Sequence, residues 1–166
     1  FEGYQKYREK ILYNRKAGIK NEIVSTKTVQ GTWLNLPYQD VRNKYMNPFH
    51  VDCTAPAFWK QKIKEYSEIG LEYLVIMAVA NERQAYYPSS FMKHAYPSNR
   101  QSPVEAIMEA ADQYGMKVFM SCGWAVNQDD NIREPAIKEL QQKIMKETAD
   151  LFKEHKSFYG WCLPVE

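Results

Sequence analysis

The sequence predicts an α/β fold: the N-terminal half of a (β/α)8 TIM barrel, with about four βα units and its end on strand four. An amphipathic helix, a glycine and a short apolar run follow one another twice in the middle of the chain. The expected strand starts, near Thr28, Leu71, Met116 and Ser157, are about forty residues apart, which suits βα units with long loops. A complete barrel typically takes about 250 residues, so this chain of 166 residues corresponds to about half of one.

The composition is typical of one globular domain, and it gives little information about binding partners. The chain is 45% hydrophobic and 25% charged, which disfavours disorder and a coiled coil. The net charge of +2 comes without a long basic run, so neither nucleic acid nor an anionic membrane surface is predicted as a partner. No apolar run approaches the ~20 residues of a membrane span. The chain begins at Phe1, so a signal segment could have preceded it, and we expect the parent chain to continue past Glu166.

The chain is expected to divide into an N-terminal helix and lead-in, residues 1–27, and the half-barrel domain, residues 28–166. Residues 4–17 are expected to form a helix that could cap the bottom of a barrel. The first strand is expected over Thr28–Asn35. A doubly wound sheet would fit parallel strands too, but no glycine-rich turn follows this strand, so dinucleotide binding is disfavoured.

The second unit begins with a helix near Thr54, which we expect to be the N-cap, with Pro56 in the first turn. Its apolar stripe is Trp59, Ile63 and Tyr66, and Gly70 is expected to end it. The apolar run Leu71–Val79 then predicts a strand that is buried on both faces.

The third unit has the clearest helix start. Ser102-Pro103-Val104-Glu105 is a capping-box sequence with proline at the first helical position. The helix has an apolar stripe of Val104, Ile107, Ala111 and Tyr114, ends at Gly115, and is followed by a strand over Met116–Cys122.

The fourth unit is a long helix and a closing strand. Apolar spacing predicts the helix up to about His155, along the stripe Ile137, Leu140, Ile144, Thr148 and Leu151. The last eight residues, Tyr159–Glu166, predict a buried strand with a carboxylate at its C-terminal tip. In a TIM barrel the working residues lie where strands end, so Glu166 is a candidate catalytic group.

Polar and aromatic residues follow each expected strand and would face one mouth. Rings that cover C–H faces, together with amides and charged groups, suit a polyhydroxylated ligand, so a carbohydrate is predicted. The candidate substrate-binding residues are Trp33, Asn35, Tyr38, Asn81, Glu82, Arg83, Tyr86, Tyr87, Trp124 and Asn127. The Tyr- and Pro-rich segment Asn81–Gln101 is expected to be an ordered flap over this mouth, or else simple surface packing, and Pro37–Cys53 is a second long insertion.

Metal, cofactor and thiol chemistry are not predicted. The three cysteines, Cys53, Cys122 and Cys162, lack zinc or redox spacing and are expected to be buried free thiols. The three histidines are far apart and form no metal-binding pattern. Cys122 lies at a strand tip without an identifiable base, so packing is favoured over a nucleophile.

A family resemblance comes from four segments: Trp33-Leu34-Asn35, the Tyr-Tyr-Pro-Ser of the flap, Ser121–Trp124 and Gly160–Glu166. They resemble the uncharacterised glycoside-hydrolase-like TIM-barrel domains of polysaccharide-using bacteria, over about residues 28–166. That family is similar to clan A retaining glycosidases, with an acid/base Glu on strand four and a nucleophilic Glu on strand seven. The resemblance implies that Glu166 is the acid/base, that the nucleophile lies outside this sequence, and that the protein is periplasmic or secreted.

One departure from that clan keeps an alternative open. The clan usually has Asn directly before the strand-four Glu, whereas this chain has Val165. A non-catalytic glycan-binding or scaffold barrel is therefore the alternative, and a barrel acting on phosphorylated substrates is a third. A strand-end Glu166 that only pairs with Arg83 would also fit the sequence. Half a barrel has open edge strands and apolar faces, so we expect these residues alone to aggregate or dimerise.

Overall fold

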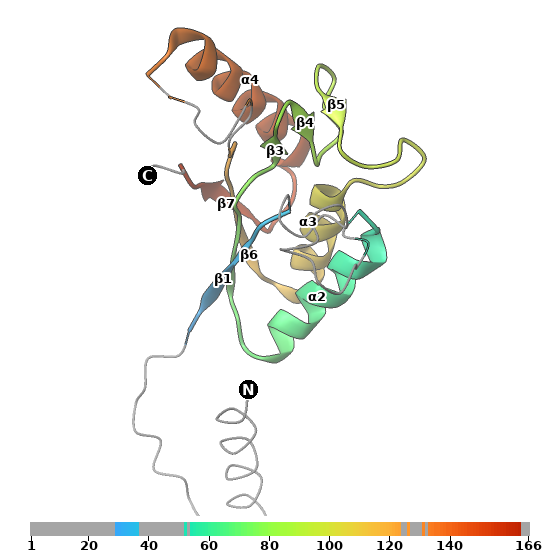
Figure 1. The fold of residues 1–166 in the computed structure, drawn as a ribbon. Helices are drawn as coiled ribbons and strands as arrows, with labels where there is room; N and C mark the ends of the chain where they lie inside the picture. The colour runs from blue at the N-terminus through green and yellow to red at the C-terminus, as the bar shows by residue number, and fades with distance from the viewer. Residues whose placement is uncertain are drawn as a thin grey trace, which may run out of the picture.

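A computed structural model gives the fold of residues 29–36, 52, 54–123, 126, 131 and 133–163. Within this part lies one four-stranded sheet with helices packed on it (Figure 1). The helix expected over residues 4–17 and most of the insertion Pro37–Cys53 lie outside the described residues. Among the described helices, none is both long and apolar enough to cross a membrane.

The main sheet is parallel throughout. Its strands are β1 (Gly31–Leu34), β2 (Tyr73–Ile76), β6 (Lys117–Met120) and β7 (Phe158–Trp161). Their order in the sheet is β1-β2-β6-β7, which is their order along the chain. A doubly wound sheet reverses its strand order at a switch point, and the described sheet has no such reversal. The predicted α/β fold of successive parallel βα units is therefore confirmed.

Three helices connect these strands: α2 (Pro56–Glu68), α3 (Pro103–Tyr114) and α4 (Pro135–Phe152). Figure 1 shows α2 and α3 side by side on one side of the sheet. Every second side chain of β2 and β6, and Leu34 of β1, is buried against these helices, and together with helix residues these side chains form the core. The strand residues of this core are Leu34, Leu74, Ile76, Val118 and Met120.

The predicted helix boundaries are mostly confirmed. Ser102 and Glu105 form both hydrogen bonds of the capping box at α3, and Gly115 ends that helix in the left-handed region. The N-cap expected at Thr54 is wrong, because Ala55 occupies that position without a side-chain hydrogen bond. The Thr54 hydroxyl instead donates to Asp52 Oδ1 at 2.7 Å, a nearer acceptor that the helical pattern did not reveal.

Burial differs from the prediction in three elements, α4, β7 and β2. Leu151 in the expected stripe of α4 is 43% exposed, whereas its neighbour Phe152 is buried. The closing strand is not buried, since Tyr159 is 57% exposed. In β2, Tyr73 and Val75 are only partly buried, unlike a strand covered on both faces. These differences share one cause in β2 and β7: the described helices pack on a single face of the sheet.

The segment after β2 is ordered, as predicted. It forms a second, small sheet of three short strands: β3 (Ala80–Asn81), β4 (Gln84–Ala85) and β5 (Lys93–His94). Strand β4 pairs antiparallel with β3 and parallel with β5. The backbone N–H of Val79 also donates to the carbonyl of Ser121, which ties the start of this segment to the end of β6.

Candidate functional site

The candidate site is the edge at which the four parallel strands end. Leu34, Ile76, Met120 and Trp161 are in register across the sheet, so the segments that follow them leave at the same edge. The N–H of Cys162 donates to the carbonyl of Met120, which extends the pairing of β7 to that edge. We call this the upper end of the sheet, and the end where the strands begin the lower end.

The end of β1 contributes Trp33 and Asn35. Trp33 is 59% exposed, and its partner in the neighbouring strand is Val75. The side-chain amide of Asn35 lies 3.3 Å from the sulfur of Met77, which follows β2. Both predicted residues therefore lie beside the end of the next strand. Tyr38 lies outside the described residues.

The segment after β2 places three predicted residues in one tight hairpin. Asn81 pairs with Gln84, and Glu82 and Arg83 form the two-residue turn between them. Both turn residues have positive φ, 47° and 61°, as a type I′ turn requires. Residues other than Gly, Asn and Asp rarely adopt this backbone conformation, so the turn is strained. Both side chains are exposed, and neither forms a hydrogen bond or ion pair with the described residues.

Tyr86 and Tyr87 lie in the same segment but are buried, Tyr87 completely. The Tyr87 hydroxyl donates to the carboxylate of Glu147 on α4 at 2.8 Å. The hydroxyl of Ser89 and the backbone N–H of Ser90 donate to the same carboxylate at 2.7 and 2.6 Å. Burial raises the pKa of Tyr87, which stays a neutral donor. These two tyrosines therefore attach the small sheet to the body of the domain.

Glu147 was missed by sequence reasoning. Partial burial acts to raise the pKa of its carboxyl group, but the hydrogen bonds from Ser90, Ser89 and Tyr87 outweigh this and hold the pKa below its usual value. The only signal in the sequence was its position on the predicted helix. Its three hydrogen-bond donors lie about sixty residues earlier, so the helical pattern could not identify them. Glu147 anchors the small sheet as a carboxylate.

The end of β6 packs tightly against the segment after β2. Gly123 has φ +63°, and a Cβ atom there would lie 2.5 Å from the Cβ of Ala78 and 2.9 Å from the carbonyl oxygen of Ala80. The Ser121 hydroxyl accepts a hydrogen bond from the N–H of Gly123. Only glycine fits this junction. Trp124 and Asn127, the predicted ligands of this loop, lie outside the described residues.

Cys122 is a buried free thiol, as expected. Burial raises its pKa to about 12, so the thiolate is scarce at neutral pH. Its Sγ lies 3.6 Å from the carbonyl oxygen of Gln141 on α4. Cys162 is a free thiol that is partly buried, and Cys53 lies outside the described residues.

The end of β7 leads toward Glu166. After β7, Cys162 and Leu163 leave the sheet at the upper end, and Leu163 is exposed. Glu166 itself, with Pro164 and Val165, lies outside the described residues.

No cluster of metal-ligating side chains occurs within the described part of the chain. His94 stacks on Tyr96, with ring centroids 5.0 Å apart, and its Nε2 lies 2.9 Å from the carbonyl oxygen of Ser89. A hollow of about 500 Å³ lies on α4, lined by Arg133, Lys138, Gln141, Gln142 and Met145. Its lining comes from one helix and the turn before it, so it does not draw together the ends of the strands.

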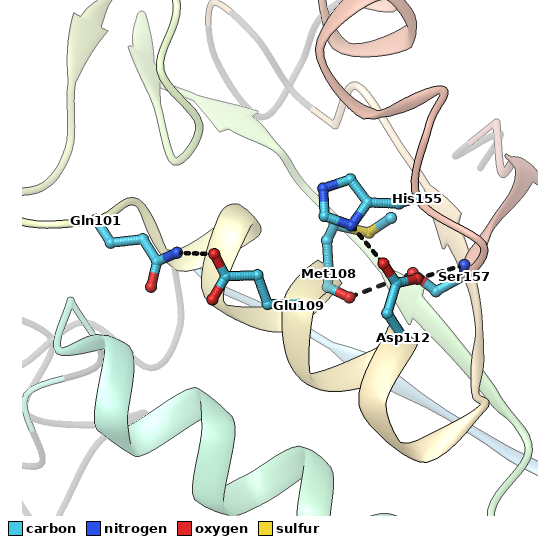
Figure 2. Close-up of polar contacts among 6 residues, drawn as sticks. All are labelled: Gln101, Met108, Glu109, Asp112, His155 and Ser157. Atoms are coloured by element: carbon cyan, nitrogen blue, oxygen red, sulfur yellow. Dashed lines mark hydrogen bonds and ion pairs between the residues drawn. The ribbon is translucent and has the colours of Figure 1, made fainter.

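The lower end of the sheet has a compact polar network (Figure 2). The Asp112 carboxylate on α3 accepts from Nδ1 of His155 at 2.8 Å and from the N–H of Ser157 at 2.7 Å. The Ser157 hydroxyl donates to the carbonyl of Met108. Serine does not contact the histidine, so this trio is not arranged as a nucleophile with its base. It fixes the start of β7 against the end of α3.

Comparison with known proteins identifies related folds. The chain is similar to the solved structure of a protein provisionally assigned as an alpha-L-fucosidase from Bacteroides thetaiotaomicron VPI-5482, with a TM-score of 0.62 and 18% identity over 86% of this chain. The match spans 45% of that protein, so this chain spans less than half its length. A second structure, an alpha-L-fucosidase GH29 from Bacteroides thetaiotaomicron, matches with a TM-score of 0.49 and 13% identity over 80% of this chain and 38% of its own.

Sequence comparison adds one family. No curated protein matches the chain. The model of a family described as a domain of unknown function, DUF4434, matches residues 29–166.

Proposed function

Because this chain belongs to the DUF4434 family, a domain of unknown function, we propose a function that its fold supports. The protein is part of a carbohydrate-active TIM barrel that resembles glycoside hydrolases and acts on a glycan. Glu166 is its general acid/base, and the exposed side chains at the upper end of the sheet contribute to the sugar site. A periplasmic or secreted location, where polysaccharides are met, belongs to the same proposal.

One observation carries the proposal: four parallel strands in sequential order end at one edge. Catalytic residues in TIM barrels come from that edge. The exposed indole of Trp33 and the exposed charged side chains of the Glu82-Arg83 turn lie on segments that reach it. An aromatic ring beside polar groups is a suitable surface for a sugar, because the ring covers C–H groups while the polar groups bind hydroxyls.

The chemistry assigned to Glu166 needs a second carboxylate. Glycosidases use two, which lie about 5 Å apart when configuration is retained and about 6.5–9.5 Å apart when it is inverted. The second would come from the part of a barrel that this chain does not span, since the chain covers 45% of the fucosidase-like structure. The C-terminal half of the barrel in the parent protein is thus the proposed partner.

The test compares Glu166→Gln with the unchanged complete protein, using aryl α-L-fucosides first and then other aryl glycosides. We expect turnover to fall by about 10²–10⁴-fold for a poor leaving group, because the glutamine cannot donate a proton. The fall should be far smaller for a dinitrophenyl leaving group, which departs without protonation. Glu154→Gln, an exposed carboxylate on the lower side, is the matched control. Equal turnover of Glu166→Gln and wild type would refute the assignment.

A second candidate is a non-catalytic glycan-binding barrel. Val165 occupies the position where related glycosidases carry an Asn that binds a sugar hydroxyl, and this observation favours the loss of catalysis. Glycan binding by calorimetry, together with no turnover of any aryl glycoside by the complete protein, would support this candidate. Turnover that depends on Glu166 would exclude it.

A further inference from the structure

The outer face of the small sheet presents a row of three polar side chains. Asn81, Gln84 and Lys93 are paired in register across β3, β4 and β5. Ala80 and Ala85, in the neighbouring row, are fully buried. Because successive side chains of a strand point to opposite faces, the three polar side chains lie on the outer face. Neighbouring side chains in such a row are about 5 Å apart, so one ligand can contact all three.

The turn beside this row adds two charged side chains on strained backbone. Glu82 and Arg83 connect Asn81 to Gln84 and have φ of 47° and 61°. Asn and Gly adopt this conformation at less cost. Strain of this kind is retained where the side chains that it presents are used. We call Asn81, Glu82, Arg83, Gln84 and Lys93 the polar hairpin surface.

Hydrogen bonds and close packing hold the base of this hairpin in place. The N–H of Val79 donates to the carbonyl of Ser121, and the N–H of Tyr86 donates to the carbonyl of Val79, both at 2.9 Å. Gly123, after β6, packs against Ala80. Strands β2 and β6 are the two inner strands of the main sheet. The hairpin is therefore fixed above the middle of the sheet, away from the edges at which further strands would be added.

Positive charge exceeds negative charge on the polar hairpin surface. Glu82, Arg83 and Lys93 are all exposed, and none forms an ion pair within the part of the chain that the structure describes. Arg100, near the end of the same segment, is different, since it pairs with Asp52 at 2.8 Å. A guanidinium group can bind a carboxylate or sulfate through two parallel hydrogen bonds, and side-chain amides bind hydroxyl groups. A sugar with hydroxyl groups and a negative charge matches this set of side chains better than a neutral sugar does.

We propose that the polar hairpin surface binds an acidic glycan. Arg83 and Lys93 bind its carboxylate or sulfate group, and the two amides of the same surface bind neighbouring hydroxyl groups. The proposal rests on the carbohydrate-active barrel of the proposed function, and it narrows the ligand to an anionic polysaccharide. Glu82 repels such a ligand, so its removal should strengthen binding. A neutral glycan would instead use all three charged side chains as hydrogen-bond partners and would lose affinity when any of them is removed.

The experiment uses two pairs of probes that differ only in charge. The first pair is oligogalacturonate and its methyl ester, and the second is κ-carrageenan oligosaccharides and their desulfated form. Calorimetry with the complete protein should show one charged probe binding about tenfold more tightly than its neutral counterpart, as two exposed ion pairs would give. The pair that shows this difference identifies the anionic group as a carboxylate or a sulfate. Added salt should weaken the binding of the charged probe, because it screens exposed charges.

The variants assign this preference to individual side chains. Arg83→Gln and Lys93→Gln should each weaken binding of the charged probe about fivefold and reduce its dependence on salt. Glu82→Gln should strengthen that binding about twofold, because it removes a repulsion between like charges. Arg83→Lys keeps the charge without the planar fork, so its affinity should lie between those of wild type and Arg83→Gln.

Lys156→Gln is the matched control, because it removes an exposed lysine at the lower end of the sheet. It should leave binding of every probe unchanged. The substituted side chains of the polar hairpin surface are exposed or partly exposed, so urea denaturation should show the same unfolding for the variants as for wild type.

Several outcomes would overturn the proposal. Neutral probes that bind as tightly as charged ones would do so while leaving the proposed function intact. So would equal weakening by Glu82→Gln and Arg83→Gln, or a preference for charge that survives both Arg83→Gln and Lys93→Gln. Failure of all four probes to bind would also overturn it. The proposed function is decided separately by the turnover of aryl glycosides, so the two failures are distinguishable.

Discussion

The lower and upper ends of the parallel sheet differ in whether their polar side chains have hydrogen-bond partners among the described residues. At the lower end, Asp112 satisfies His155 and the N–H of Ser157 in one short network. At the upper end, Glu82 and Arg83 occupy a strained turn with exposed charges that the described residues leave unpaired. In TIM barrels the lower end serves stability and the upper end serves function. Substitutions at the two ends should therefore differ in kind: the lower end loses stability, and the upper end loses ligand affinity unless packing is disturbed.

The largest expected loss of stability comes from a packing contact at the upper end, where a substitution should disturb packing. Gly123→Ala should lower the free energy of unfolding by about 3 kcal/mol, because the new methyl group adds a clash with Ala78 to left-handed strain. Gly115→Ala at the lower end is the matched control. Its φ of +67° is similar, but nothing lies within 4 Å of the added methyl group, so about 1 kcal/mol is expected. Urea denaturation measures both, and equal losses would show that crowding at Gly123 is relieved cheaply.

The next effect probes the network at the lower end. Asp112→Ala should cost about 2 kcal/mol, because it removes two charge-assisted hydrogen bonds from a carboxylate that water partly screens. Asp112→Asn keeps one acceptor and should cost about half as much. Glu82→Gln at the upper end is the control and should change stability by less than about 0.5 kcal/mol. A larger loss at Glu82 than at Asp112 would invert the comparison between the two ends.

The anchor of the small sheet gives a smaller effect that depends on pH. The folded state holds the pKa of Glu147 below its unfolded value, so its contribution is fully present above the unfolded pKa and is lost as pH falls through the folded one. Glu147→Gln should therefore cost about 1 kcal/mol at pH 7, after allowance for screening by water, and less as pH falls below 4.5, the ordinary pKa of a glutamate carboxyl group. Urea titrations of both proteins between pH 7 and pH 3 measure the difference. A difference that does not shrink on acidification would mean that the carboxylate charge is not what the hydrogen bonds stabilise.

Local signals were sufficient for much of the fold. The order helix, glycine and strand predicted the parallel βα units, and Ser102 with Glu105 predicted a complete capping box. These features depend on residues within a few positions of each other, so the sequence displays them directly. The cap at Thr54 failed for a related reason: Asp52, two residues earlier, competes for its hydroxyl.

Contacts between distant segments were not predictable in this way. Glu147 meets its three donors from almost sixty residues away, and nothing in its helical surroundings identifies them. The burial of Tyr87 has the same origin. The turn at Glu82 and Arg83 was not expected either, because these residues lack the Asn-Gly pattern by which a type I′ hairpin is recognised. All of the candidate site residues remain predictions as ligand-binding or catalytic groups, and Tyr38, Trp124, Asn127 and Glu166 also lie outside the described residues.

The last expected effect is a gain in stability, and it tests why the Glu82-Arg83 turn keeps its charged side chains. Replacing Glu82-Arg83 with Asn-Gly should raise the free energy of unfolding by about 1 kcal/mol, because both new residues adopt positive φ more readily. Glu82→Gln with Arg83→Gln removes the charges but keeps the strain, so its stability should match wild type within about 0.5 kcal/mol. If the charges serve the proposed sugar site, both double variants should bind a glycan substrate more weakly to a similar extent in the complete protein. If both double variants bind the glycan as tightly as wild type, this turn has no role in binding, and at this position the upper end does not differ in function from the lower end. A gain in stability together with a loss of affinity would mean that the strain is retained for the sake of the side chains it presents.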